Sequence, residues 1–121
     1  LWCNLAFHPI SALTRETLVD ICQYPPTRDL ALPMMTEAQT IAEQLDIKFP
    51  IAIEQRIAGA EEVGAHKTSM LQDIETGRPT EVDAIVGSVA ELGRLTDTPT
   101  PAIDALYASV RLVEKTLRHV S

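Results

Sequence analysis

Apolar residues recur every three or four positions along most of the chain, a spacing typical of helices that bury one face. From Val82 onward, the apolar positions lie at offsets of 0, 3, 4, 7, 10 and 13 residues. A second set with similar spacing begins at Ile103. The pattern therefore predicts helices within four segments: Leu30–Leu45, Ile53–Ala60, Val82–Leu95 and Ile103–Leu117.

Proline and glycine residues mark the limits of these segments. Pro25 and Pro26 separate a short predicted helix, Arg15–Cys22, from the long one that follows. Gly77 is placed to end a helix, and Pro79 follows it as a stop signal. We therefore predict an all-α domain of six or seven helices, in which only Phe49–Ile53 could hold a short strand.

The composition narrows the possible classes of protein. The 121 residues suit one compact domain, and a hydrophobic fraction of 45% argues against disorder. The net charge of −7 argues against binding to nucleic acid, and no apolar run reaches the ~20 residues of a membrane span. Two cysteines, Cys3 and Cys22, are expected to be reduced thiols. We expect a cytoplasmic protein without a metal site, because no ligand pairs stand at short spacing.

The first residues, LWCNLAF, are unusually apolar for a natural amino terminus. They resemble the interior of a buried helix, and no basic segment of a signal peptide precedes them. We therefore expect the chain to be a fragment of a longer protein, with part of the functional apparatus upstream of Leu1.

A polar stripe crosses this apolar segment. Asn4, His8 and Ser11 follow each other at intervals of four and three, which places them on one face of a helix. Pro9 removes a backbone donor within that helix and is expected to kink it. Buried polar side chains need hydrogen-bond partners. The stripe is therefore either satisfied by nearby backbone or exposed to a polar ligand in a cleft.

A second polar group lies around the break at Gly77. Thr80 and Asp83 resemble a capping box with Asp in place of Glu, and Glu81 lies in the first turn of the next helix. Ser69 lies in the helix before the break. Thr80 and Glu81 could be plain capping residues and Ser69 a tolerated small residue, while His66 and Lys67 are expected at the surface or the edge of the core and not as ligands. These features alone do not identify a reaction.

Two stretches resemble a known family. SMLQDI, then GRPTEVDAI, then a glycine in the next turn, PTP and a last helix containing LY, resemble the C-terminal domain of the ketopantoate reductase (2-dehydropantoate 2-reductase) family. The upstream NLAFHPISALT resembles the N-x-x-x-N-P-x-x-A-L segment of that family. The resemblance covers nearly all of residues 1–121.

The resemblance implies a fold and an activity. The fold is an all-α domain like the C-terminal domain of 6-phosphogluconate dehydrogenase. The whole enzyme pairs this substrate domain with an N-terminal Rossmann domain that binds NADPH, and no G-x-G-x-x-G motif is present here. The implied reaction reduces 2-dehydropantoate to (R)-pantoate, a step toward pantothenate, and the isolated helical domain is expected to be inactive.

The resemblance also assigns roles to residues. The catalytic lysine of the family, a general acid toward the ketone, would stand immediately before Leu1. Asn4 and Ser69 match substrate-binding residues, and Glu81 matches a glutamate that faces the nicotinamide of the cofactor. His8 stands where the family usually has a second asparagine, and Leu18 stands near a further one.

These two departures leave the substrate open. One alternative is a reductase of the same fold that acts on a different 2-oxo acid. The other is a helical dimerisation or partner-binding module without catalysis. For the reductase, the expected partners are a small 2-oxo acid and a second copy in a homodimer, with no nucleic acid and no membrane.

Overall fold

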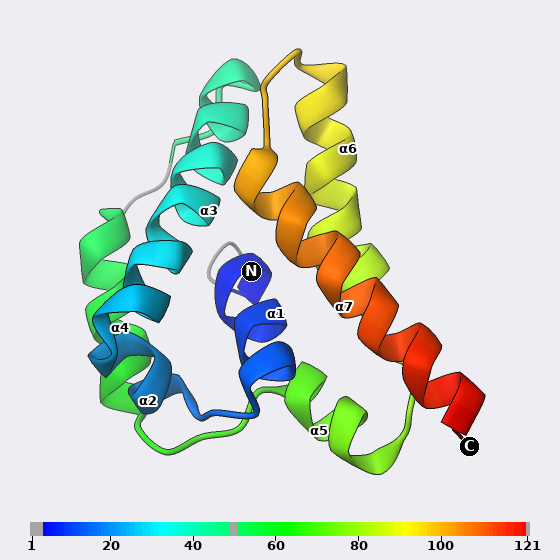
Figure 1. Cartoon of the computed structure of the whole chain (residues 1–121). Helices are drawn as coiled ribbons and strands as arrows, with labels where there is room; N and C mark the ends of the chain where they lie inside the picture. The colour runs from blue at the N-terminus through cyan, green and yellow to red at the C-terminus, as the bar shows by residue number, and fades with distance from the viewer. Residues whose placement is uncertain (1–3, 49–50, 121) are drawn as a thin grey trace.

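The computed structural model describes residues 4–48 and 51–120, and within these ranges the protein is helical without a strand, which confirms the all-α prediction. Ile51 and Ala52 are not in a strand, and Phe49 and Pro50 lie outside the described residues. The helices in chain order (Figure 1) are α1 (Asn4–Thr14), α2 (Leu18–Gln23), α3 (Pro25–Gln44), α4 (Ile53–Val63), α5 (Ser69–Thr76), the π-helical turn η1 (Asp83–Gly87), α6 (Ser88–Leu95) and α7 (Pro101–Val120).

Helix α1 occupies the middle of the molecule (Figure 1) and packs against α3, α5 and α7. Seven of its eleven residues are buried, which explains why the first part of the sequence is so apolar. Pro9 lies inside α1 and is buried, and the helix continues through it to Thr14. The helices around α1 therefore supply the walls of a single core.

The long helices α3 and α7 flank α1 and approach each other at one end (Figure 1). Helix α2 packs on α4, and α6 packs on α3 and α7. Aliphatic and methionine side chains fill the core, and their burial is the main stabilising contribution to such a fold. The largest fully buried side chains are Leu5, Ile10, Ile21, Met34, Ile41, Ile57, Met70, Leu71, Val82, Val86, Ile103 and Val110.

The short helix begins later than predicted. Arg15 has a φ of 65°, in the left-handed region, and its amide donates to the Ser11 carbonyl at 2.8 Å, so it closes α1. Helix α2 begins only at Leu18. The predicted helix Arg15–Cys22 is therefore wrong at its start, because periodicity does not report where the backbone changes direction.

The predicted end of α5 at Gly77 is confirmed. Gly77 has a φ of 75°, a conformation that suits a residue without a side chain. Its amide bonds the Ile74 carbonyl at 3.3 Å, and the next amide, of Arg78, bonds the Asp73 carbonyl at 2.9 Å. This pair of bonds forms a Schellman motif, which turns the chain sharply toward Thr80.

The predicted capping box at Thr80 and Asp83 is wrong in its second half. The Thr80 hydroxyl accepts from the Val82 amide at 3.3 Å, as a cap would. The Thr80 amide, however, donates to Glu114 of α7 at 2.9 Å, and Asp83 instead accepts from Tyr107. A distant helix has taken over the role predicted for a local carboxylate.

The segment after Thr80 also departs from a regular α-helix. Residues Asp83–Gly87 form a π turn, whose wider winding rotates the residues that follow. Ala90 and Gly93 are buried, whereas Leu95, predicted on the apolar face, is 75% exposed. Gly93 is required by packing, because a Cβ there would lie 2.7 Å from the Thr100 Cγ2 atom.

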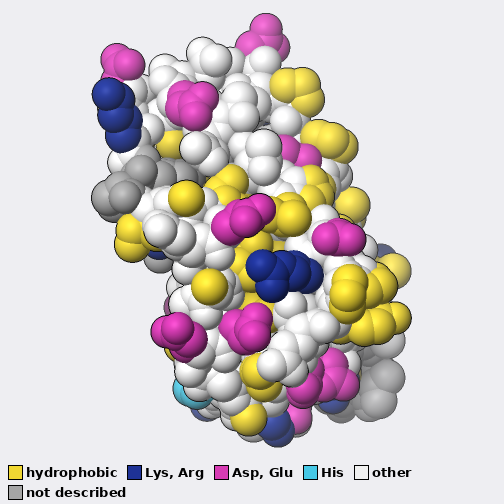
Figure 2. All heavy atoms as spheres, turned by 90° about the vertical axis from the view of Figure 1, so that its left-hand side faces the viewer, with side chains coloured by type: hydrophobic (Ala, Val, Ile, Leu, Met, Phe, Trp, Pro, Cys, Tyr) yellow, Lys and Arg dark blue, Asp and Glu magenta, His cyan; other side chains and the backbone are white. Residues whose placement is uncertain are grey.

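Among the described residues, no helix combines the length and the hydropathy that a membrane crossing requires. Figure 2 shows the left-hand side of the view in Figure 1, where hydrophobic side chains form small patches and acidic side chains are scattered between them. The exposed large hydrophobic side chains of the molecule include Tyr24, Leu45, Ile47 and Val63. The acidic side chains are therefore dispersed over this face and do not form one acidic patch.

The start of α7 is capped from α3. The two carboxylate oxygens of Glu37 accept hydrogen bonds from the amides of Ala102, at 2.9 Å, and Ile103, at 3.0 Å. These amides belong to the first turn of α7, whose donors have no partner within the helix. The half-buried Glu37 carboxylate therefore satisfies both donors and joins the two longest helices.

We predict that Glu37→Ala lowers the free energy of unfolding by about 1–2 kcal/mol, because two amides lose a charged acceptor. Urea unfolding followed by circular dichroism measures the change. Glu43→Ala is the matched control, since Glu43 is exposed on the same helix and should change stability by less than about 0.5 kcal/mol. Equal losses in the two variants would contradict the capping role.

Candidate functional site

A hollow of about 410 Å³ lies where α1, α4 and the start of α5 meet. It brings together Asn4 and His8, one turn apart on α1, with Ser69, the first residue of α5. All three were predicted from the sequence to bind substrate, and they converge here although Ser69 is far from the others along the chain. The remaining lining residues are Phe7, Leu18, Ala60, Val63, His66 and Thr68.

A chain of buried hydroxyl groups fixes α5 against α1. The Ser11 hydroxyl donates to the His8 carbonyl at 2.8 Å and lies 2.5 Å from the Thr68 hydroxyl. Because Ser11 uses its one proton on that carbonyl, Thr68 is the donor between the two hydroxyls. The Thr68 oxygen also accepts from the Leu71 amide at 3.1 Å and so caps α5. Ser11, the third residue of the polar stripe, therefore has a structural role that places Ser69 beside His8.

His8 is half-buried, and its Nδ1 atom is buried without a hydrogen-bond partner. The nearby backbone therefore provides no hydrogen bond to Nδ1, contrary to the first of the two interpretations of the polar stripe. Burial, the largest cause, lowers the pKa of the imidazole from its usual 6.5 and keeps it neutral near pH 7. A neutral imidazole offers one N–H and one lone pair, so His8 can bind a polar group that enters the hollow.

Two backbone hydrogen bonds complete the wall of the hollow opposite α1. The Leu18 amide donates to the His66 carbonyl at 3.2 Å, and the Val19 amide donates to the Gly64 carbonyl at 3.1 Å. They hold the segment after α4 against the start of α2. This contact places the exposed His66 at the hollow, a position the sequence did not suggest, since no local pattern reports pairing between loops.

Leu18 lies in the same hollow. It stands near the position where the resemblance suggested a further asparagine, so the hollow has an aliphatic side chain where a polar one was expected. Together with Ala60 and Val63 of α4, it makes one side of the hollow apolar. The side formed by Asn4 and Ser69 is polar.

Glu81, the predicted cofactor contact, is not among the residues that line this hollow. It is exposed and lies between two residues that contact α7, Thr80 and Asp83. The structure therefore does not bring Glu81 together with Asn4, His8 and Ser69 within this domain. Its predicted role remains a hypothesis about a neighbouring part of the site.

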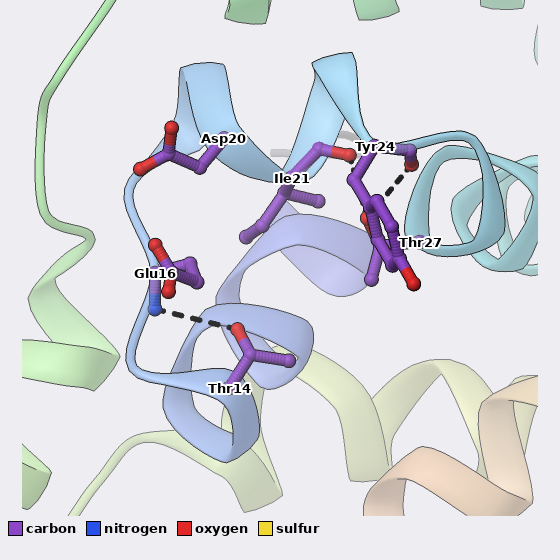
Figure 3. Close-up of a pocket in the computed structure, with 6 residues that line it drawn as sticks. All are labelled: Thr14, Glu16, Asp20, Ile21, Tyr24 and Thr27. Atoms are coloured by element: carbon purple, nitrogen blue, oxygen red, sulfur yellow. Dashed lines mark hydrogen bonds between the residues drawn. The ribbon is translucent and has the colours of Figure 1, made fainter.

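A second hollow, of about 460 Å³, lies at the junction of α1, α2 and α3 (Figure 3). Glu16 and Asp20 lie on one side of it, and Tyr24 and Thr27 lie on the other (Figure 3). Two carboxylates repel an anion, whereas the lining of the first hollow contains no carboxylate. An anion would therefore meet less repulsion in the hollow at Asn4, His8 and Ser69.

Within residues 4–48 and 51–120, no group of three or more histidine, cysteine, aspartate or glutamate side chains could hold a metal ion. Cys22 is a free and buried thiol whose hydrogen lies toward the Ile57 carbonyl, with the two heavy atoms 3.7 Å apart. Burial raises its pKa, which disfavours the reactive thiolate. Cys3 lies outside the described residues. Cys22 is therefore a core residue.

Comparison with protein families identifies a match over most of the chain. The model of the family described as "Ketopantoate reductase PanE/ApbA C terminal" matches residues 1–114. A 2-dehydropantoate 2-reductase of Mesorhizobium japonicum is 60% identical over 111 residues, which are 92% of this chain and 34% of that protein. The chain thus spans about a third of the length of the curated relatives it matches.

Solved structures of ketopantoate reductases contain a domain of the same fold. A PanE/ApbA family ketopantoate reductase from Ralstonia eutropha superposes with a TM-score of 0.90 at 25% identity, over 98% of this chain and 40% of the other. A ketopantoate reductase from Staphylococcus aureus, described as dimeric, superposes with a TM-score of 0.77 at 26% identity, over 96% and 41%. Both likenesses extend over nearly the whole helical domain.

The lowered pKa of His8 predicts how stability depends on pH. The imidazole takes up a proton more readily in the unfolded chain, so stability is full above about pH 6.5 and falls as the pH decreases below that value. His8→Asn should lose less stability than the wild type between pH 7 and pH 5.5. Urea unfolding at both pH values measures the difference.

The interval from pH 7.5 to pH 8.5 is the control, because the imidazole is neutral in both states there and the two proteins should respond alike. An equal loss in the wild type and in His8→Asn between pH 7 and pH 5.5 would contradict the burial of a neutral His8.

Proposed function

Because the chain belongs to the ketopantoate reductase family, whose C-terminal domain it matches, we propose that it is the substrate-binding helical domain of a nicotinamide-dependent 2-dehydropantoate 2-reductase. The remaining two thirds of such a protein would include an N-terminal Rossmann domain that binds NADPH. The isolated helical domain would be inactive, since it lacks both that domain and the catalytic lysine.

The convergence of Asn4, His8 and Ser69 in one hollow is the observation that carries the proposal. A 2-oxo acid presents a ketone oxygen and a carboxylate, both of which need hydrogen-bond donors when water is excluded. The Asn4 amide, the Ser69 hydroxyl and an N–H of a neutral His8 are such donors. Three donors from two helices suit a small ligand with two adjacent acceptor groups.

Electrostatics favour an anion at the same place. Ser69 is the exposed first residue of α5, where the helix dipole creates a partial positive charge. The lining carries no carboxylate that would oppose it. The substrate carboxylate would therefore bind near Ser69, which leaves the ketone toward Asn4 and the amino-terminal end of α1.

The proposed chemistry adds a hydride to the ketone carbon and a proton to its oxygen, which gives a 2-hydroxy acid. The nicotinamide cofactor supplies the hydride when it is bound. A lysine immediately before Leu1 would donate the proton, and the coding sequence upstream of Leu1 tests its presence. Asn4 and His8 would lie one and two helical turns from that lysine and would orient the ketone toward it.

Glu81 would contact the cofactor and not the substrate. Its exposure outside the hollow suits a contact with a molecule that another domain carries. A carboxylate accepts hydrogen bonds from amide and hydroxyl groups, which a nicotinamide riboside provides. The S. aureus relative described as dimeric supports a homodimer as the assembled form.

A reductase of another 2-oxo acid is the second candidate. His8 replaces an amide with a larger ring, and Leu18 adds an aliphatic side chain to the apolar side of the hollow. The larger ring leaves less room beside α1, and the aliphatic side chain favours a more apolar substituent than the family asparagines would. Rates of the full-length enzyme on 2-dehydropantoate and on other 2-oxo acids separate the candidates, and low, similar rates on all would contradict the pantoate assignment.

We predict that Ser69→Ala in the full-length enzyme lowers kcat/KM for the 2-oxo acid about 10- to 100-fold, because a donor to a charged group is lost. Steady-state oxidation of the reduced nicotinamide cofactor measures this. Thr76→Ala is the matched control, because it removes an exposed hydroxyl at the other end of α5 that bonds only along its own helix. A kcat/KM within about twofold of the wild type for Ser69→Ala would favour the non-catalytic module.

A further inference from the structure

Glu81 is held between two contacts with α7. The residue before it, Thr80, donates its amide to Glu114 Oε2 at 2.9 Å. Two residues after it, the Asp83 carboxylate accepts from the Tyr107 hydroxyl at 2.5 Å and from Arg111 Nη1 at 2.6 Å. The backbone on both sides of Glu81 is therefore tied to the same helix.

The three α7 residues form one row. Tyr107, Arg111 and Glu114 follow each other at intervals of four and three, so they lie on one face of α7. Glu114 is 8% exposed, a low value for a carboxylate, and its burial fits a charge that is hydrogen-bonded to backbone. Tyr107 and Arg111 are nearer the surface, with the guanidinium carbon 6.0 Å from the ring centroid. This row is one continuous set of contacts along the segment that carries Glu81.

The π turn depends on the same row. Its wide winding is shown by the Ser88 amide, which bonds the Asp83 carbonyl five residues back. A Cβ added at Gly87 would lie 3.0 Å from the Cζ and Oη atoms of Tyr107, so the ring packs directly on a residue without a side chain. The hydrogen bond to Asp83 is the largest cause that raises the pKa of Tyr107, which keeps the phenol protonated as a donor. The tyrosine ring and hydroxyl thus contact both ends of the turn.

We propose that Tyr107, Arg111 and Glu114 are positioning residues, which fix the π turn and thereby direct the Glu81 carboxylate toward the cofactor. The inference rests on the proposed function, because it requires that Glu81 contacts the cofactor. An exposed glutamate on a mobile backbone would sample many directions and would lose conformational entropy when it binds the cofactor. The contacts with α7 already fix this backbone, so less entropy is lost on binding. Tyr107 contributes more than Arg111, because the Arg111–Asp83 ion pair is largely exposed and such pairs stabilise little.

A double-mutant cycle in the full-length enzyme tests this inference. Tyr107→Phe removes only the hydroxyl and should raise the KM for the reduced nicotinamide cofactor about two- to tenfold, with the KM for the 2-oxo acid unchanged. In a Glu81→Gln background, the same substitution should have no further effect on the cofactor KM. Ser109→Ala is the matched control, since it removes an exposed hydroxyl from the same helix that bonds only the Ala105 carbonyl.

The possible results distinguish the positioning role of α7 from the cofactor contact of Glu81. A cofactor KM that rises equally in both backgrounds, or does not rise at all, would overturn the positioning role while the proposed function stands. A Glu81→Gln enzyme with wild-type constants would instead reject the proposed cofactor contact, and the positioning role would fall with it. Thermal unfolding of each variant distinguishes a lower stability, which a purely structural role would produce, from a specific change in cofactor KM.

Gly87→Ala provides a second test, in which Tyr107 keeps its hydroxyl group. The added methyl group displaces the ring of Tyr107 from the turn, because the ring is the side that can move. We expect the same selective rise in cofactor KM, again absent in the Glu81→Gln background. A Gly87→Ala enzyme with an unchanged cofactor KM would contradict a role for the packing of Tyr107 on the turn.

Discussion

The buried contact between the hydroxyls of Ser11 and Thr68 is the interaction on which the candidate site depends. Ser11 belongs to the central helix α1, and Thr68 caps α5, so one hydrogen bond joins the two helices that supply Asn4, His8 and Ser69. Both hydroxyls are buried, and an unpaired one would be costly, so the pairing is strongly favoured. The contact therefore holds the start of α5 against α1, so that Ser69 and His8 line the same hollow.

Carboxylates on distant helices complete the fold in the same manner. Glu37 of α3 accepts from the first turn of α7, and Glu114 of α7 accepts from the Thr80 amide. In both cases a helix start or turn is satisfied by another helix and not by its own sequence neighbours. Each contact provides an acceptor for a backbone amide and also holds two helices together. The segments that carry candidate site residues are therefore positioned by contacts between helices.

The sequence predicted what depends on local rules. Apolar periodicity and the breakers located the helices, and Gly77 ended α5 as its position indicated. The spacing of Asn4 and His8 placed them on one face of α1, where they line one hollow. The fold class and the family therefore followed from residues close together in the chain and from their resemblance to known motifs.

Features that depend on contacts between distant segments were not predictable in this way. The π turn at Asp83–Gly87 is stabilised by Tyr107, which lies on another helix, so the periodicity from Val82 suggested a regular α-helix and a buried Leu95. His66 reaches the hollow through backbone pairing with α2, and Glu81 lies outside it because α7 directs its segment elsewhere. Each of these positions is determined by packing between helices, which a single sequence does not reveal.

The central claim is that the hollow at Asn4, His8 and Ser69 binds a 2-oxo acid, and a crystal structure of the full-length protein with cofactor and substrate tests it most directly. We predict that the substrate carboxylate lies within hydrogen-bond distance of Ser69 and that the ketone lies beside Asn4. Substrate bound in the acidic hollow at Glu16 and Asp20, or bound without contact to α1 and α5, would contradict it.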